Sequence, residues 1–389
     1  MSFSDLVFWS CATLTLYTYV GYPLLLAAST AGRYRKGDGE SVDPGWESPP
    51  VSMIIPAYNE EQVIARKIQN SLELDYPAAK LEIVVVSDGS IDATEKMARE
   101  AAGQRVRLVF RADHQGKTAC INAVLPGLSG EIVVFTDANA LFFPDAMRRL
   151  AAPFCDSSIG CVMGELQYRR EDSLNSSLGE GLYWRYENFI KERESRLGST
   201  IVGNGAIYAM RRSLCRSLPL QVEADVANPL LALRAGSRVV FERRARCWER
   251  AAGTVREEFG RKTRIITNQI VTYLCGSRDW APLSVGAAFQ ITSHKVLRWL
   301  VPLFLVGMFL ASAVEAEASA TFRWLLAFQG AFYLLAVGGW LWESLGGQVP
   351  RLLFVAYYYC AVNAASLKGI LDFLLGKRYV VWEKAASTR

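Results

Sequence analysis

The 389-residue chain is 51% hydrophobic with a formal net charge of +5, which fits one large domain plus membrane segments and is too apolar for a soluble domain alone. Its basic residues cluster at the edges of hydrophobic runs, where they usually meet anionic lipid headgroups. No basic stripe with base-stacking aromatics supports a nucleic-acid partner. Its eight cysteines include no CxxC pair, which argues against a zinc site or disulfide framework and favours a reduced, cytosolic main domain.

The first predicted element is a membrane span at Leu6–Ala28, a nearly uncharged stretch about long enough to cross a ~30 Å hydrocarbon core. It has neither the positive start nor the cleavage site of a signal peptide. Three basic residues follow within 33–36, and the positive-inside tendency places the chain after them in the cytosol. We therefore expect a transmembrane helix in residues 1–30, a linker over 31–50, and a multi-pass protein of the inner or plasma membrane with a cytosolic catalytic domain.

The middle of the chain alternates short apolar runs with helical patterns. The runs are typical of strands buried in a parallel sheet, and helical patterns such as Glu60–Leu72 and Asp92–Ala102 lie between them. This order predicts a doubly wound, mostly parallel α/β sheet within a domain over residues 51–256. The predicted strands are Val51–Ile55, Leu81–Val86, Val106–Phe110 and Ile132–Phe135.

Beyond residue 178 the sequence mixes aromatic with charged residues. Such segments favour helices at the membrane interface, although core-facing amphipathic helices explain the periodicity equally well. We assign residues 257–296 to interfacial helices. The mixed segments are Leu182–Ile190, Phe259–Leu274 and Leu283–Trp299.

Three apolar runs near the end of the chain predict further transmembrane helices over residues 297–376, followed by a tail at 377–389. Lys368 and Asp372 lie within the last run, and charges inside a span cost a few kcal/mol. The last run is therefore expected either to span or to turn back at the interface. The runs are Leu297–Val314, Trp324–Trp342 and Leu352–Leu375.

Two segments at the ends of predicted strands indicate a nucleotide site. PAYNEE at 56–61 follows the first strand, and VSDGSID at 86–92 ends the second. Ligands bind doubly wound sheets at the carboxyl ends of strands. Tyr58 can stack on a base, and Glu60 and Asp88 can accept hydrogen bonds from ribose hydroxyls and a base imide. Turn chemistry explains either segment alone, whereas the two in this order favour a nucleotide.

A metal site is predicted at TDAN, residues 136–139, where Asp137 and Asn139 present oxygen ligands one residue apart. The spacing resembles the DxD element that holds a divalent ion against a diphosphate, with Asn139 in place of the second carboxylate. Mg²⁺ and Mn²⁺ prefer such ligands, and substrate phosphates would complete the shell. Lys117, within QGKTACIN at 115–122, follows a glycine where a cation can reach phosphate, although no Walker A frame surrounds it.

In this order, PAYNEE, VSDGSID, HQGKTACINA and TDAN resemble the family-2 glycosyltransferases, the membrane group that includes cellulose, chitin and hyaluronan synthases. The resemblance runs from about Val51 to Arg264. It implies a GT-A type fold, a UDP-sugar or similar donor, a divalent cation and inversion at the anomeric carbon. The donor-binding residues it implies are Pro56, Tyr58, Glu60, Asp88, Lys117, Asp137, Arg261 and Arg264.

The resemblance also assigns the acceptor side and the base. GNGAIYAMRR at 203–212 is similar to the strand and turn that line the acceptor pocket, so Asn204, Gly205 and Trp184 are the expected acceptor-binding residues. VEAD at 222–225 aligns with the family's carboxylate pair, whose second member is the general base. Asp225 is then the base, and Glu223 substitutes for the first carboxylate. Without an acidic neighbour at residue 224, the pKa of Asp225 is expected to be lowered.

The family's QxxRW motif is replaced here by RKTRI at 261–265. Arg261 and Arg264 lie one helical turn apart and can hold the leaving diphosphate. Ile265 stands where polymer-making relatives stack a sugar on tryptophan, which argues against processive polymerisation, whereas the multi-span tail favours it.

Two enzymes therefore stay open: an inverting transferase that builds a polysaccharide or glycan at the membrane, and one that adds a single sugar to a lipid or lipid-linked acceptor. From another class, a catalytically silent sugar-nucleotide-binding membrane protein also fits.

Overall fold

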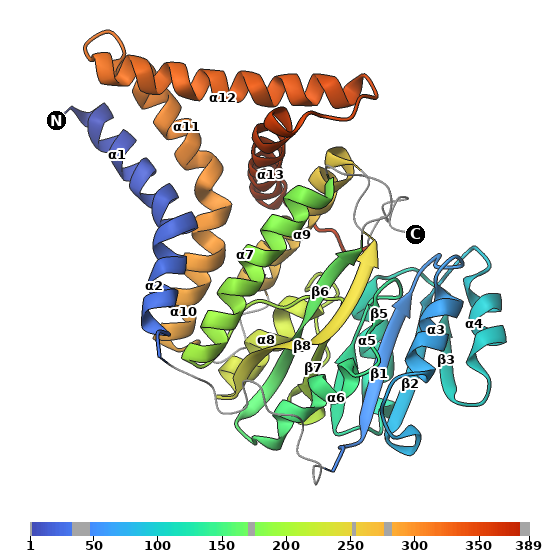
Figure 1. The fold of residues 1–389 in the computed structure, drawn as a ribbon. Coiled ribbons are helices and arrows are strands. Elements are labelled where there is room, and N and C mark those ends of the chain that lie inside the picture. Colours follow the sequence, from blue (N-terminus) through green and yellow to red (C-terminus); the bar gives the residue numbers. More distant parts are fainter. Residues whose placement is uncertain (1, 33–46, 170–175, 251–253, 276–281, 382–389) are drawn as a thin grey trace.

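A computed structural model describes residues 2–32, 47–169, 176–250, 254–275 and 282–381 of the chain. An α/β domain carries a group of long helices on one side (Figure 1). The basic residues within 33–36, on which the predicted orientation in the membrane rests, lie outside the described residues.

One eight-stranded sheet forms the centre of the domain, in the order β3-β2-β1-β4-β7-β6-β8-β5. The four strands from β1 to β4 are parallel, because a helical crossover returns the chain after each of the first three. β7 runs antiparallel to β4 and β6, while β8 pairs parallel with β6 and antiparallel with β5. The strands are β1 (Val51–Ala57), β2 (Leu81–Asp88), β3 (Val106–Arg111), β4 (Ile132–Phe135), β5 (Leu141–Phe142), β6 (Ile159–Arg169), β7 (Tyr208–Arg211) and β8 (Arg238–Arg250).

Helices cover both faces of the sheet, so β1 and β4 are buried along their whole length. The four predicted strands are confirmed to within two residues. The predicted helices begin later than expected, at Ile64 and Thr94, because turns fill the strand ends; Asn59 in the first turn has a φ of +52°. The covering helices are α3 (Ile64–Leu72), α4 (Thr94–Ala102), α5 (Lys117–Val124), α6 (Ala146–Ala151) and α8 (Ala224–Arg234), with 3₁₀ turns η2 (Ala78–Lys80), η3 (Leu125–Gly127), η4 (Ala152–Cys155) and η5 (Arg212–Leu214).

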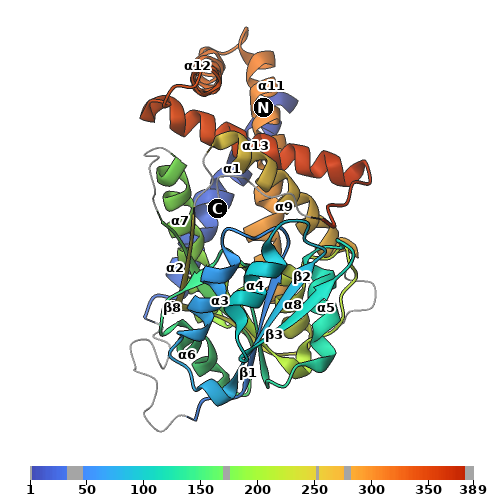
Figure 2. The same ribbon diagram turned by 90° about the vertical axis from the view of Figure 1, so that its right-hand side faces the viewer.

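Two long helices join the domain to the helical group (Figure 2). α7 (Ser176–Leu197) packs against β6 and β8 on one side and against α2 on the other. α9 (Val255–Cys275) packs against α8 and α13. Each helix thus contacts both the domain and the helical group, and their predicted place at the membrane interface stays a prediction. The third mixed segment, Leu283–Trp299, lies largely within the candidate span Val285–Glu315 rather than in a separate interfacial helix.

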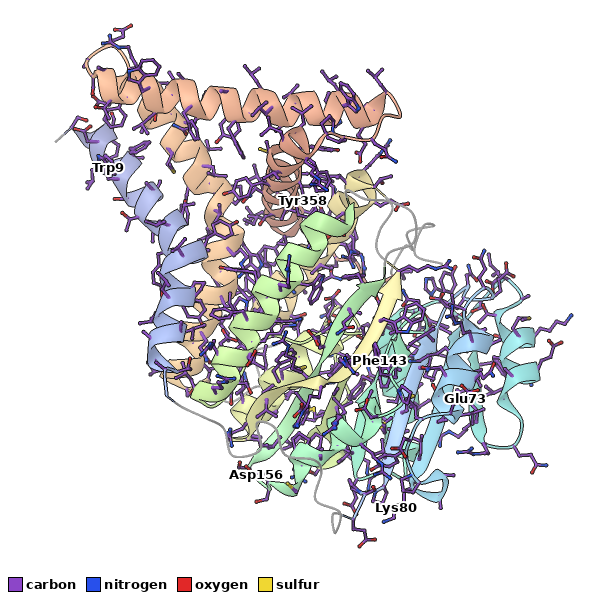
Figure 3. All side chains as sticks on the ribbon, in the orientation of Figure 1. Trp9, Glu73, Lys80, Phe143, Asp156 and Tyr358 are labelled. Carbon is purple, nitrogen blue, oxygen red and sulfur yellow. The ribbon has the colours of Figure 1, made fainter. Side chains whose placement is uncertain are left out.

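Within the described residues, three helices are long and apolar enough to cross a membrane: Phe3–Ser29, Val285–Glu315 and Ala320–Ser344. Their apolar side chains face outward in many places, as Trp9 does (Figure 3), which is expected of a lipid-facing surface. The first two contain π-helical turns. The elements are α1 (Phe3–Leu16), η1 (Tyr17–Gly21), α2 (Tyr22–Ser29), α10 (Val285–Ile291), η6 (Thr292–Val296), α11 (Leu297–Glu315) and α12 (Ala320–Ser344).

The fourth apolar run forms α13 (Arg351–Leu374), which is not among these candidates. Asp372 is only 2% exposed and accepts hydrogen bonds from Lys368 Nζ (2.7 Å) and Tyr379 OH (2.8 Å). In Figures 1 and 2, α1 and α11 run side by side, and α12 and α13 run crosswise to them. Whether this run spans or turns back at the interface stays a prediction.

Candidate active site

A cavity of about 730 Å³ lies at the carboxyl ends of β1 and β4. Its walls come from these strand ends, from α7, α8 and α9, and from the segment after α13. All but two of the predicted site residues line it, although they come from seven separate parts of the chain. Those lining it are Pro56, Glu60, Lys117, Asp137, Asn139, Trp184, Asn204, Gly205, Glu223, Asp225, Arg261 and Arg264.

Three charged side chains meet around Gly205 at the centre of the cavity. Lys117 Nζ forms an ion pair with Asp137 and donates a hydrogen bond to the Gly205 carbonyl at 3.3 Å. A Cβ at Gly205 would lie 2.9 Å from Lys117 Nζ and 3.4 Å from the nearest oxygens of Asp137 and Asp225. Burial alone would lower the pKa of Lys117, but Asp137 and Asp225 raise it above its ordinary value, so it is a cation.

The carboxylate pair stands at the start of α8, with Glu223 as N-cap and Asp225 in the first turn. Glu223 Oε1 accepts a hydrogen bond from Asn268 Nδ2 at 2.9 Å. Burial, and then the charge of Asp225, raise the pKa of Glu223 to about 7. Burial also raises the pKa of Asp225, with Asp137 adding to the effect and Lys117 opposing it. The expected lowering of the Asp225 pKa is wrong, because burial and Asp137 supply what the missing neighbour at residue 224 would have supplied.

The two arginines of RKTRI have different surroundings on α9. Arg261 donates to Glu258 Oε2 at 2.8 Å and to the Tyr168 hydroxyl at 3.0 Å. Arg264 lies close enough to the carboxylate pair for its charge to lower the pKa values of both members. Only Arg264 therefore acts directly on the carboxylate pair.

Tyr58 and Asp88 do not line the cavity. Tyr58 stacks on the ring of His114 with centroids 3.4 Å apart. Asp88 is fully buried and accepts hydrogen bonds from the Gly116 amide (2.6 Å) and the Gln115 amide (3.2 Å), and its Oδ2 lies 2.7 Å from His114 Nδ1. Asp88 thus holds the loop that leads into α5 and Lys117, and donor binding by either residue stays a prediction.

The predicted metal ligands project from the turn that follows β4. Lys67 lies fully buried beneath this turn and donates to Thr136 Oγ1 at 2.9 Å and to the Ala140 carbonyl at 2.5 Å. Within the described residues, no three His, Cys, Asp or Glu side chains form a metal-binding group. One carboxylate and one amide from Asp137 and Asn139 suit a hard cation only when other oxygens, such as those of a diphosphate, share it.

The predicted acceptor residues also line the cavity. Asn204 is 9% exposed; its Oδ1 accepts from the Ala206 amide at 3.0 Å, while its Nδ2 has no hydrogen-bond partner among the described residues. Trp184 presents its ring near Tyr168, with centroids 5.8 Å apart. A buried amide donor and an aromatic face that line one cavity are suited to a sugar hydroxyl and ring.

Sequence reasoning missed several residues of the cavity. Glu249, at the end of β8, is buried, and its Oε1 has no hydrogen-bond partner in the described chain. Burial and then the charge of Asp137 raise the pKa of Glu249 to about 8. Its only signal in the sequence is a carboxylate at a strand end, and that strand was not predicted.

The segment after α13 also forms part of the wall, although the sequence suggested only a tail. Asn268 Nδ2 donates to the Tyr379 carbonyl at 2.9 Å, and the Tyr379 amide donates back to Asn268 Oδ1 at 3.3 Å. Val380 passes so close to Gly116 that a Cβ there would lie 2.2 Å from its carbonyl oxygen. Residues 382–389 of the predicted tail lie outside the described residues.

Comparisons with known proteins agree with this geometry. Residues 52–218 match the model of the family "Glycosyl transferase family 2". An N-acetylglucosaminyltransferase of Mesorhizobium japonicum is 32% identical over 316 residues, covering 74% of this chain and 70% of that protein. One from Rhizobium leguminosarum bv. viciae is 30% identical over 183 residues, so the match spans only 43% of its length and 46% of this chain.

Among solved structures, a mannosyltransferase from Pyrobaculum calidifontis, in complex with GDP-mannose and Mn²⁺, matches over 96% of this chain and 100% of its own. The TM-score is 0.73 and the sequence identity 24%, a level at which the likeness concerns the fold.

Proposed function

Because the chain belongs to glycosyl transferase family 2 and has its GT-A type fold, we propose that it transfers a sugar from a nucleotide diphosphate donor to an acceptor at the membrane. The convergence of Lys117, Asp137 and Asp225 on Gly205 is the observation that carries this proposal. Each of the three has a role in sugar transfer: Lys117 is a cation for a phosphate, Asp137 an oxygen ligand for a metal, and Asp225 a carboxylate base. They surround one point where a donor and an acceptor can meet.

The donor side of the proposed site comprises Asp137, Asn139, Lys117 and Arg264. Asp137 and Asn139 would hold Mg²⁺ or Mn²⁺, an ion that neutralises charge on the leaving diphosphate. Lys117 now pairs with Asp137 and is placed to turn toward a phosphate. We propose a UDP-sugar as donor, with UDP-N-acetylglucosamine the first to test, since the relatives named above are N-acetylglucosaminyltransferases.

Asp225 is the proposed general base, which takes the proton of the acceptor hydroxyl as that oxygen attacks the anomeric carbon. The first turn of a helix stabilises its carboxylate form, and Lys117 does the same. A direct displacement of this kind inverts the anomeric centre. Glu223, held by Asn268, tunes the charge at the base.

The acceptor would lie along Trp184 and Asn204, whose Nδ2 is available for a sugar or lipid hydroxyl. We propose a glycan or a lipid at the membrane as the acceptor, reached from the side of the candidate spans. In the orientation that the basic residues within 33–36 favour, the catalytic domain is cytosolic.

The test uses the full chain, purified in detergent, with Mn²⁺ and a panel of UDP- and GDP-sugars. Nucleotide release and mass spectrometry of membrane extracts report transfer. We expect turnover with at least one UDP-sugar, and its loss in Asp137→Ala with the melting temperature kept. Donor binding without turnover in the presence of native membranes would instead identify a silent sugar-nucleotide-binding protein.

A further inference from the structure

The far wall of the cavity carries buried charges that the proposed chemistry does not use. Glu187 and Lys191 reach it from α7, and Lys295 reaches it from η6, inside a candidate membrane span. Their exposed fractions are 2%, 1% and 7%. Charged groups are rarely buried so completely without a partner, so the pairing of each one is informative.

Glu187 is fully compensated. Its Oε1 accepts from Lys295 Nζ at 3.1 Å, its Oε2 accepts from Arg298 Nη1 at 2.7 Å, and His294 Nε2 lies 3.3 Å from Oε1. Burial alone would raise the pKa of Glu187, but Lys295, His294 and Arg298 lower it well below its ordinary value. Glu187 is therefore an anion, and the side chains of His294 and Lys295 in η6 and of Arg298 in α11 balance its charge.

Lys191 lacks such a partner. Among the described residues no carboxylate lies within salt-bridge distance of its Nζ, which instead stands over the rings of Trp184 (5.1 Å) and Phe241 (5.8 Å). Burial lowers the pKa of Lys191 to about 8 against the opposing charge of Glu187, so the ammonium form predominates at pH 7. The wall thus holds a cation that no carboxylate contacts, although the charges of Glu187, Glu194 and Glu165 act on it from farther away and that of Lys295 opposes them.

A buried ammonium ion has a desolvation cost of several kcal/mol unless an anion accompanies it. Aromatic faces recover part of this cost but leave the ammonium hydrogens without acceptors. The cation lines the same cavity as the base and Trp184, next to a membrane-span helix. An anion that arrives there with the acceptor would supply the direct contact that Lys191 Nζ lacks among the described residues.

We propose that Lys191, with Lys295 beside it, binds the phosphate or diphosphate group of a lipid acceptor. The inference rests on the proposed function, since it names the class of acceptor for that site. Phosphate fits better than carboxylate because its several oxygens can accept from two ammonium groups at once. Lipid is the expected source because α2 and η6, both parts of candidate spans, pack beside α7.

The test measures binding rather than turnover. Full-length protein in detergent is titrated with farnesyl phosphate, farnesol and inorganic phosphate, by calorimetry, for the wild type, Lys191→Met, Lys191→Arg and Lys96→Met. Lys96 is an exposed residue of α4, so its variant matches the charge change away from the cavity. A melting-temperature shift with UDP checks that each variant is folded.

We expect the wild type to bind farnesyl phosphate at least about tenfold more tightly than farnesol, the scale of one charge-assisted hydrogen bond. Lys191→Met should abolish this preference, whereas Lys191→Arg and Lys96→Met should keep most of it. Equal affinities of the wild type for phosphate and alcohol, or an undiminished preference in folded Lys191→Met, would overturn the proposal. Inorganic phosphate binding as tightly as farnesyl phosphate would overturn the lipid assignment.

The proposed function can fail independently. Farnesyl phosphate binding that depends on Lys191 without nucleotide release from any donor would preserve the subsite and refute sugar transfer. Nucleotide release from a donor, without a preference for farnesyl phosphate over farnesol, would support sugar transfer and refute the phosphate subsite.

Discussion

Adding a single methyl group at Gly205 tests the geometry of the proposed site most directly. The new Cβ in Gly205→Ala would lie 2.9 Å from Lys117 Nζ, whereas an ordinary contact begins at 3.4 Å, so the ammonium group must retreat by about 0.5 Å. It ends a flexible side chain, so the stability cost should lie near the low end of the roughly 1–3 kcal/mol that overpacking typically costs. A misplacement of about 1 Å at reacting groups can reduce rates about 10²-fold.

We therefore expect kcat/KM for nucleotide release to fall about ten- to hundredfold, which corresponds to about 1.4–2.7 kcal/mol of transition-state stabilisation. The melting temperature should change little. Gly203→Ala is the control, because its Cβ would lie 1.7 Å from the backbone oxygen of Asp225 and should destabilise the fold instead. Activity of Gly205→Ala within threefold of wild type would refute the placement of Lys117, Asp137 and Asp225 around the reacting groups.

The remaining predictions concern the base, the coupled carboxylate, the metal and the topology. Asp225→Asn should lower transfer by about 10²–10⁴-fold with nearly unchanged UDP affinity, and near-normal transfer would show that the base lies elsewhere. Burial raises the pKa of Glu223 from 4.5 to about 7, so the folded wild type should lose stability as pH rises from about 4.5 to about 7. The melting-temperature advantage of Glu223→Gln should then grow over that range, and a constant difference would contradict the assigned environment. Excess EDTA should abolish nucleotide release and Mn²⁺ should restore it; full activity in EDTA would exclude the metal. Exposed Cys155 should react with an impermeant thiol reagent only after cells are permeabilised, whereas labelling of intact cells would reverse the orientation.

The parallel half of the sheet could be predicted because its strands are continuous apolar runs, as β1 and β2 are. The mixed half, formed by β7, β6, β8 and β5, could not be predicted. β8 alternates buried and exposed residues and contains five arginines, a pattern that local periodicity does not separate from surface structure. Its place beside β6 depends on long-range pairing.

The residues of the candidate site likewise fall into those that the sequence could suggest and those that it could not. Residues in contiguous motifs, such as Asp137 and Asp225, could be proposed from the sequence because those motifs resemble a known family, and both line the cavity. Glu249, Lys191 and Asn268 could not, since each enters the cavity through contacts between distant segments. The pKa of Asp225 is raised rather than lowered for the same reason, because its burial and then its neighbour in space, Asp137, both depend on segments that are distant in sequence.

Because α9, η6 and the segment around Tyr379 supply part of the cavity wall, the catalytic unit cannot be excised at the domain boundary. A soluble fragment ending near Arg250 would keep the proposed donor-binding residues Lys117, Asp137 and Asn139. It would lose Arg264, Lys295 and Tyr379. Such a fragment is suited to crystallising a nucleotide complex and unsuited to screening for inhibitors of transfer. Compounds that contact both these donor-binding residues and the wall formed after residue 250 would be found only with the intact chain in detergent or a nanodisc.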